Sequence, residues 1–112
     1  MYNYNGRVFK SVQHSENAET VEGSIFEYHQ EGNIVTCSYK SRNIKQGHLM
    51  AIVHSDGGLD MRYHQVNSKG QLMTGHCQST PELLANDKIR LHEKWKWTSG
   101  DLSEGHSILE EQ

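Results

Sequence analysis

Hydrophobic and polar residues alternate along several stretches of the chain, a pattern typical of β-strands whose two faces meet different surroundings. The clearest case is the segment 89–97, in which one set of alternate positions is apolar apart from one acid and the other set is basic. The first set is Ile89, Leu91, Glu93, Trp95 and Trp97, and the second is Arg90, His92, Lys94 and Lys96. This pattern predicts a strand that turns its apolar face, and with it Glu93, towards a core.

Turn signals such as Asp56-Gly57-Gly58 and Ser68-Lys69-Gly70 separate runs rich in β-branched and aromatic residues. These runs predict about eight strands, at residues 7–14, 20–30, 33–40, 44–54, 59–66, 71–79, 88–98 and 104–110. One helical turn is predicted at 81–86, because Ser79 and Glu82 have the spacing of a capping box and Pro81 suits the first turn.

The predicted strands are joined by short connections, which favours an antiparallel meander because parallel pairing needs crossovers of a dozen or more residues. Closing such a sheet removes its two exposed edges. We therefore expect an all-β fold, with residues 1–112 forming a single domain shaped as a small lipocalin-like or avidin-like barrel. A two-sheet β-sandwich is the alternative. A barrel of about eight strands is either filled by side chains or holds one small ligand.

The segment 59–79 predicts a β-hairpin whose turn ends at Gly70. The turn sets the strand register, which pairs Leu59, Met61, Tyr63 and Gln65 with Ser79, Cys77, Gly75 and Met73. In this register the ring of Tyr63 covers Gly75. A slip by one residue would turn the opposite side chains inward, and the turn alone does not exclude it.

The inward positions of the predicted strands combine into an apolar surface with few polar groups, the usual composition of a small-molecule site. The predicted lining of a binding pocket is Tyr39, Met61, Tyr63, Gln65, Glu93, Trp95 and Trp97. In the alternative, a solid barrel, the polar groups satisfy one another and any function lies on the surface.

Glu93 would be the polar anchor of this pocket, and burial should raise its pKa unless inward donors compensate. The donors available in the predicted register are Tyr39, Tyr63, Gln65 and the indole N–H of Trp95. In the alternative, a bulge turns Glu93 to solvent beside Lys94.

Composition narrows the function classes further. The formal net charge is −3 and no block of like charges occurs, so the sequence predicts neither nucleic-acid binding nor membrane binding. It shows no signal-peptide pattern and no apolar run long enough to span a bilayer, and a cytoplasmic protein is expected. Cys37 and Cys77 are expected to be free thiols. The oligomeric state stays open.

The eight histidines show no ligand spacing such as H-x-H or H-E-x-x-H, and most fall on polar strand positions, so no metal site is predicted. Nucleophile-elbow, phosphate-loop and dinucleotide motifs are also missing, and no cofactor is predicted. The basic stripe formed by Arg90, His92, Lys94 and Lys96 is more typical of a solvated strand face than of a binding face.

Three motifs carry a resemblance to a known family: M-R-Y-H-Q-V-N at 61–67, S-T-P-E-L at 79–83 and I-R-L-H-E-K-W-K-W-T-S-G-D at 89–101. With these motifs the chain resembles a family of small bacterial proteins, mostly uncharacterised, some of which are named N-acetylglutamate synthase. That name implies acetyl transfer, but no Arg or Gln here begins the Q/R-x-x-G-x-G/A turn with which acetyltransferases of the common fold hold the coenzyme.

Two function hypotheses follow from the sequence. The first is non-catalytic binding of a small, partly apolar ligand inside the barrel. The second is an enzyme, either the acetyltransferase that the resemblance implies or an acid–base catalyst that uses Glu93.

Overall fold

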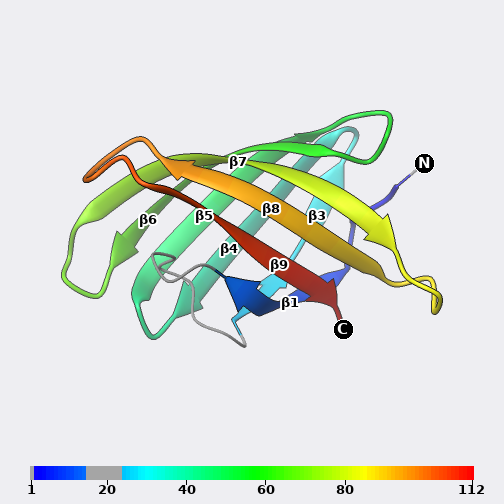
Figure 1. The fold of residues 1–112 in the computed structure, drawn as a ribbon, viewed down its shortest axis with the longest axis horizontal. Coiled ribbons are helices and arrows are strands. Elements are labelled where there is room, and N and C mark those ends of the chain that lie inside the picture. The colour runs from blue at the N-terminus through cyan, green and yellow to red at the C-terminus, as the bar shows by residue number, and fades with distance from the viewer. Residues whose placement is uncertain (1, 15–23) are drawn as a thin grey trace.

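The structure is a computed structural model that describes residues 2–14 and 24–112. In this part of the chain all regular structure is β, and nine strands form one antiparallel sheet (Figure 1). The strands are β1 (Val8–His14), β2 (Ile25–Glu27), β3 (His29–Glu31), β4 (Ile34–Ser41), β5 (Ile44–Val53), β6 (Leu59–Asn67), β7 (Leu72–Leu83), β8 (Ile89–Trp97) and β9 (Glu104–Glu111). Their order in the sheet is β2-β1-β9-β8-β7-β6-β5-β4-β3.

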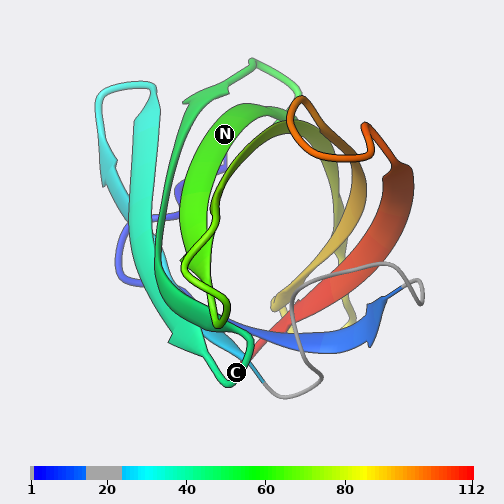
Figure 2. The same cartoon turned by 90° about the vertical axis from the view of Figure 1, so that its left-hand side faces the viewer.

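The sheet closes into a nearly complete barrel because its two edge strands are neighbours in the sequence. Only Tyr28 separates β2, which pairs with β1, from β3, which pairs with β4. The chain thus bends at Tyr28 and bridges the two edges, and Figure 2 shows the resulting ring of strands. Backbone bonds fix the bend: the N–H of Tyr28 donates to the carbonyl of Arg7, and its carbonyl accepts from the N–H of Gly6, both at 2.9 Å. A single sheet of this kind excludes the two-sheet sandwich.

Seven of the predicted strands are confirmed with ends shifted by a few residues. The exception is the strand predicted at 20–30, which is divided into β2 and β3 at the Tyr28 bend. Its residues 20–23 lie outside the described part of the chain. The bend depends on contacts with Gly6 and Arg7, far away in the sequence, so alternation alone did not predict it.

The helical turn predicted at 81–86 is wrong, since β7 continues through Pro81 to Leu83. Beyond Ser79, the partner of the first residue of β6, this strand pairs only with β8, so Pro81 has a neighbouring strand on one side. Proline is tolerated at such an edge because its missing N–H leaves no partner unsatisfied. Glu82 does not cap a helix; it contacts His92 across the strands at 2.8 Å.

The hairpin register predicted for 59–79 is confirmed, with Tyr63 opposite Gly75 and Gln65 opposite Met73. The side chain of Asn67 organises the turn, because its Oδ1 accepts hydrogen bonds from the backbone N–H groups of Lys69 (3.0 Å) and Gln71 (2.9 Å). Gly70 has φ +79°, a conformation that glycine adopts without steric cost.

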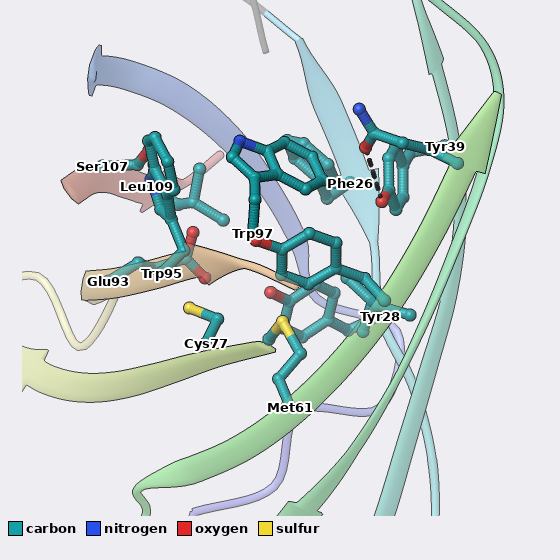
Figure 3. Close-up of a pocket in the computed structure, with 13 residues that line it drawn as sticks. Phe26, Tyr28, Tyr39, Met61, Cys77, Glu93, Trp95, Trp97, Ser107 and Leu109 are labelled. Atoms are coloured by element: carbon teal, nitrogen blue, oxygen red, sulfur yellow. Dashed lines mark hydrogen bonds between the residues drawn. The ribbon is translucent and has the colours of Figure 1, made fainter. Parts of the chain in front are cut away.

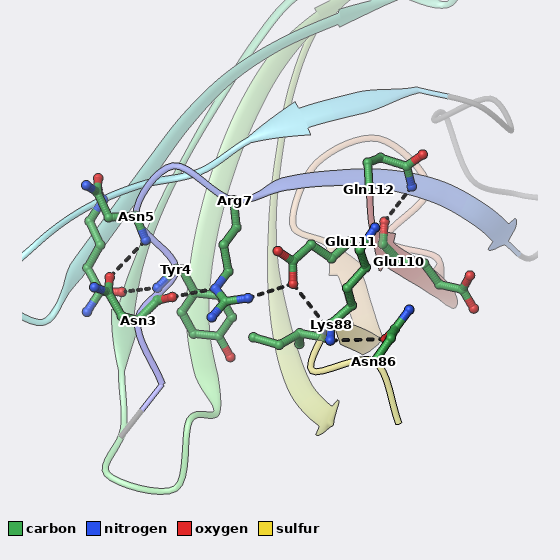
Figure 4. Close-up of polar contacts among 11 residues, drawn as sticks. Asn3, Tyr4, Asn5, Arg7, Asn86, Lys88, Glu110, Glu111 and Gln112 are labelled. Atoms are coloured by element: carbon green, nitrogen blue, oxygen red, sulfur yellow. Dashed lines mark hydrogen bonds and ion pairs between the residues drawn. The ribbon is translucent and has the colours of Figure 1, made fainter. Parts of the chain in front are cut away.

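Aromatic side chains fill the barrel at the end where the β3–β4, β5–β6 and β7–β8 turns lie. Tyr4, Phe9 and Tyr28 are fully buried there, and the Tyr4 hydroxyl donates to the carbonyl of Gly57 at 2.6 Å. Nearby, Glu111 accepts hydrogen bonds from the Arg7 guanidinium at 2.7 Å and from the backbone N–H of Ile89 at 3.0 Å (Figure 4). This packing closes one end of the barrel.

Candidate functional site

A cavity of about 70 Å³ lies inside the barrel, next to the aromatic end, with Tyr28 belonging to both (Figure 3). It is lined by Phe26, Tyr28, Tyr39, Leu49, Met61, Tyr63, Gln65, Cys77, Glu93, Trp95, Trp97, Ser107 and Leu109. Each of these side chains occupies an inward position of its strand or, for Tyr28, of the bend between two strands. The cavity is therefore a direct product of the alternation in the sequence.

All seven residues predicted to line a pocket lie around this one cavity. Sequence reasoning placed Cys77 inside the barrel but left it out of the pocket. It missed the other five members of the lining, Phe26, Tyr28, Leu49, Ser107 and Leu109. For some of them a signal was present: in S-I-F-E-Y-H at 24–29, Ser24, Phe26 and Tyr28 alternate with exposed residues.

Glu93 points into the barrel, where it lines the cavity and is largely removed from solvent. The β7–β8 pairing runs without a bulge from Gly75 to Leu83, so the alternative in which Glu93 turns to solvent is wrong. Burial raises the pKa of the Glu93 carboxyl to about 7, opposed by a hydrogen bond from Ser79. That bond is long, with 3.4 Å between Ser79 Oγ and Glu93 Oε2, so it compensates little of the desolvation.

Two of the four donors predicted for Glu93 bond elsewhere. The Tyr39 hydroxyl donates to Gln65 Oε1 at 3.0 Å, as the dashed line in Figure 3 marks, and the Trp95 indole N–H donates to Ser107 Oγ at 2.9 Å. The prediction that Tyr39 and Trp95 serve Glu93 is therefore wrong. These bonds instead hold the aromatic rings in place around the cavity.

Two buried polar atoms of the lining, Tyr28 Oη and Gln65 Nε2, have no hydrogen-bond partner among the described residues. A buried polar group without a partner costs free energy, so each such group needs an explanation. Burial raises the pKa of the Tyr28 hydroxyl well above its usual value, and the nearby Glu93 charge raises it further. Tyr28 is thus a protonated donor that lines the same cavity as the Glu93 carboxylate.

Aromatic rings supply most of the cavity wall. Tyr63 and Trp97 meet edge to face with ring centroids 5.2 Å apart, and Trp95 and Trp97 are 6.1 Å apart. Tyr63 lies over Gly75, where an added Cβ would come within 2.6 Å of its ring. Tyr39 covers Gly47 in the same way. The two glycines therefore make room for inward tyrosines.

The described residues give little support to a metal site or to a reactive cysteine. They contain no group of three or more His, Cys, Asp or Glu side chains placed to hold a metal ion. Cys37 and Cys77 are buried free thiols, and burial raises the pKa of Cys37 to about 12 and that of Cys77 well above its usual value, so neither is a thiolate near neutral pH. The same part of the chain contains no helix with the length and hydrophobicity needed to cross a lipid bilayer.

Comparisons with known proteins identify the family. No curated protein and no solved structure matches the chain. The sequence model of the avidin-like protein family matches residues 2–112. This match spans every strand of the barrel, and the chain therefore belongs to the avidin-like protein family.

Proposed function

We propose that this protein binds one small, partly apolar ligand in the barrel cavity without catalysing a reaction. The observation that carries the proposal is the pair of buried, unpartnered donors in the cavity wall, Tyr28 Oη and Gln65 Nε2. Groups that cost stability in the free protein gain partners when a ligand with acceptor atoms enters. The predicted residues Tyr39, Met61, Tyr63, Gln65, Glu93, Trp95 and Trp97 would contact that ligand.

The cavity limits what fits inside the barrel. Its volume of about 70 Å³ is well below the roughly 300–1,000 Å³ of sites that take drug-sized molecules. The ligand, or the part of it that enters the barrel, is therefore small unless side chains move. A solid barrel with a purely surface role explains the structure less well, because the two buried donors would then have no hydrogen-bond partner in any state of the protein.

An enzyme is the second candidate, and one observation favours it. A buried carboxyl with a pKa of about 7 suits a general acid or base at neutral pH. Acetyl transfer, which the resemblance to proteins named N-acetylglutamate synthase implies, requires a coenzyme much larger than the cavity. Turnover of acetyl-coenzyme A with glutamate above background would favour that alternative over binding alone.

A thermal-shift screen across classes of small metabolites tests the proposal. A ligand at a hundred times its dissociation constant adds roughly 2.7 kcal/mol to the free energy of unfolding. Biotin belongs in the screen, because the streptavidin barrel binds it. The only two tryptophans, Trp95 and Trp97, line the cavity, so a change in tryptophan emission verifies that a hit binds inside.

Tyr28→Phe is the informative variant, because it removes only the unpartnered hydroxyl. We expect it to reduce the stabilisation by a hit ligand without lowering the ligand-free melting temperature. Tyr2→Phe is the matched control and should retain the full shift, because Tyr2 packs on Tyr4 and Gly57 and does not line the cavity. Flat melting curves for all ligand classes would contradict the proposal, and so would equal shifts in wild type and Tyr28→Phe.

The state of Cys37 and Cys77 also indicates the cellular compartment of the protein. Both are free thiols in the structure, and free thiols are usual in reducing compartments. We propose the cytoplasm on this ground. The fraction of the protein recovered with soluble cytoplasmic markers checks it.

A further inference from the structure

In the part of the chain that the structure describes, the cavity contains one carboxyl group, that of Glu93, without a cationic partner and within an aromatic wall. We infer that the natural ligand is a small organic cation of the alkylammonium type that also carries an acceptor atom. Its charged end lies against Glu93 and the surrounding rings, and its acceptor serves the unpartnered donors Tyr28 Oη and Gln65 Nε2. This inference rests on the proposed function and gives the ligand a chemical class.

The charge balance of the lining is the first argument. Among the described residues around the cavity, Glu93 is the only acid and there is no Lys, Arg or His. The basic side chains of the same strand, including Lys94 and Lys96, lie on the exposed face. A buried carboxylate without a cationic partner is costly, and a cationic ligand supplies the missing partner.

The aromatic wall is the second argument. It is formed by Phe26, Tyr28, Tyr39, Tyr63, Trp95 and Trp97. Cations are attracted to the faces of such rings, most strongly to Trp and most strongly when water is excluded. The hydrogen bonds of Tyr39 to Gln65 and of Trp95 to Ser107 hold two of the rings in position. An aromatic wall around one carboxylate thus offers a cation two kinds of attraction and offers an anion repulsion.

The other ionisable groups near Glu93 stay neutral around pH 7. Tyr28 in the β2–β3 bend, Tyr39 in β4, Tyr63 in β6 and Cys77 in β7 all have pKa values raised by burial. Cys37 in β4 behaves in the same way. The lining residues of β5 and β9, which are Leu49, Ser107 and Leu109, do not ionise in this range. Any change in cation binding between pH 6 and 8 that arises within the cavity wall therefore reports on Glu93.

Three probes of similar size and different charge test the inference: n-butylammonium, n-butanol and butanoate. Binding is followed by tryptophan emission at pH 8 and at pH 5.5. At pH 8, where Glu93 is ionised, we expect butylammonium to bind about tenfold more tightly than butanol, and butanoate to bind most weakly. At pH 5.5 the carboxyl is protonated, and the preference for the cation should be lost.

Glu93→Gln keeps the shape of the side chain and removes the charge. It should bind butylammonium and butanol equally at both pH values, whereas Lys94→Gln, the neighbour on the outer face, should behave like wild type. Circular dichroism verifies that the variants are folded, and the pH dependence of the wild type alone provides an independent measure.

Three results would overturn the inference: equal binding of butylammonium and butanol by the wild type at pH 8, discrimination that survives in folded Glu93→Gln, or no binding of any probe. The proposed function is judged separately by the metabolite screen. A neutral or anionic hit that stabilises the wild type more than Tyr28→Phe would keep ligand binding and reject the cationic class.

Discussion

We expect the buried Glu93 carboxyl to lower the free energy of unfolding of the ligand-free protein at neutral pH. This carboxyl has an ordinary pKa of 4.5, and burial in the cavity raises this value to about 7. Between these two pH values the folded state binds more protons than the unfolded state, so the free energy of unfolding falls as the pH rises. The loss is complete above pH 7 and absent below pH 4.5, the reverse of the usual behaviour of a salt-bridged acid.

The substitution Glu93→Gln should remove this dependence. A shift from 4.5 to about 7 corresponds to about 3 kcal/mol at 1.36 kcal/mol per pKa unit. We therefore expect Glu93→Gln to gain about 3 kcal/mol relative to wild type between pH 4.5 and pH 8. Urea unfolding of both proteins at the two pH values measures the gain. The contribution of the histidines to the pH dependence is the same in both proteins, so it cancels in the difference between them.

Lys94→Gln serves as the control for the pH dependence of Glu93→Gln. It lies one residue away on the exposed face, and its stability relative to wild type should change little between pH 4.5 and pH 8. A difference between Glu93→Gln and wild type that stays constant with pH would show that the carboxyl ionises normally and that the cavity is well hydrated.

At the scale of elements, alternation predicted the strands whose two faces differ most. In β8 the inward residues are apolar apart from Glu93 and the outward residues are basic. In the 59–79 hairpin the turn sets the register of the two strands. The sequence failed at 81–86, where the local preference for a helical turn lost to pairing with β8. It failed also at Tyr28, where the bend depends on Gly6 and Arg7.

For the candidate site, the sequence predicted which residues line the cavity but not how their side chains pair. Membership of the lining follows from strand phase, which is a local property, so Tyr39, Trp95 and Trp97 could be assigned from the sequence. The partners of these side chains depend on distances across the barrel. Tyr39 and Gln65 lie on strands separated by β5, and only the closed sheet shows that they meet.

The match between Tyr63 and Gly75 leads to a prediction for β7. An added Cβ at Gly75 would lie 2.6 Å from the Tyr63 ring, so Gly75→Ala must displace that ring and, through it, Trp97. We expect a loss of about 1–3 kcal/mol in the free energy of unfolding, the usual range for overpacking, together with a change in tryptophan emission. Urea unfolding followed by fluorescence measures both quantities.

Leu72→Ala is the control for this strand, because Leu72 is 68% exposed on β7. It should change the free energy of unfolding by less than about 0.5 kcal/mol and leave the emission unchanged. If Gly75→Ala were as harmless as Leu72→Ala, the ring of Tyr63 could not be fixed over Gly75.

At the scale of the whole molecule, the barrel is held together unevenly. β5 and β6 pair over nearly their full lengths, whereas β2 and β3 each pair with their neighbour at three positions. These two short ladders form the seam that closes the ring (Figure 2). Segments with few backbone pairs open with a lower free energy than the rest of a fold. The seam also carries Phe26 and Tyr28, two members of the cavity lining.

Hydrogen exchange of the native protein should reveal this unevenness. We expect the backbone amides of residues 25–31 to exchange faster than those of β6 and β7, which have paired strands on both sides over most of their length. A ligand in the cavity contacts Phe26 and Tyr28, so it should slow exchange in 25–31 more than in the 68–71 turn. Equal protection around the ring would mean that the seam is as stable as the long ladders. A ligand effect spread evenly over the strands would mean that binding does not involve the seam.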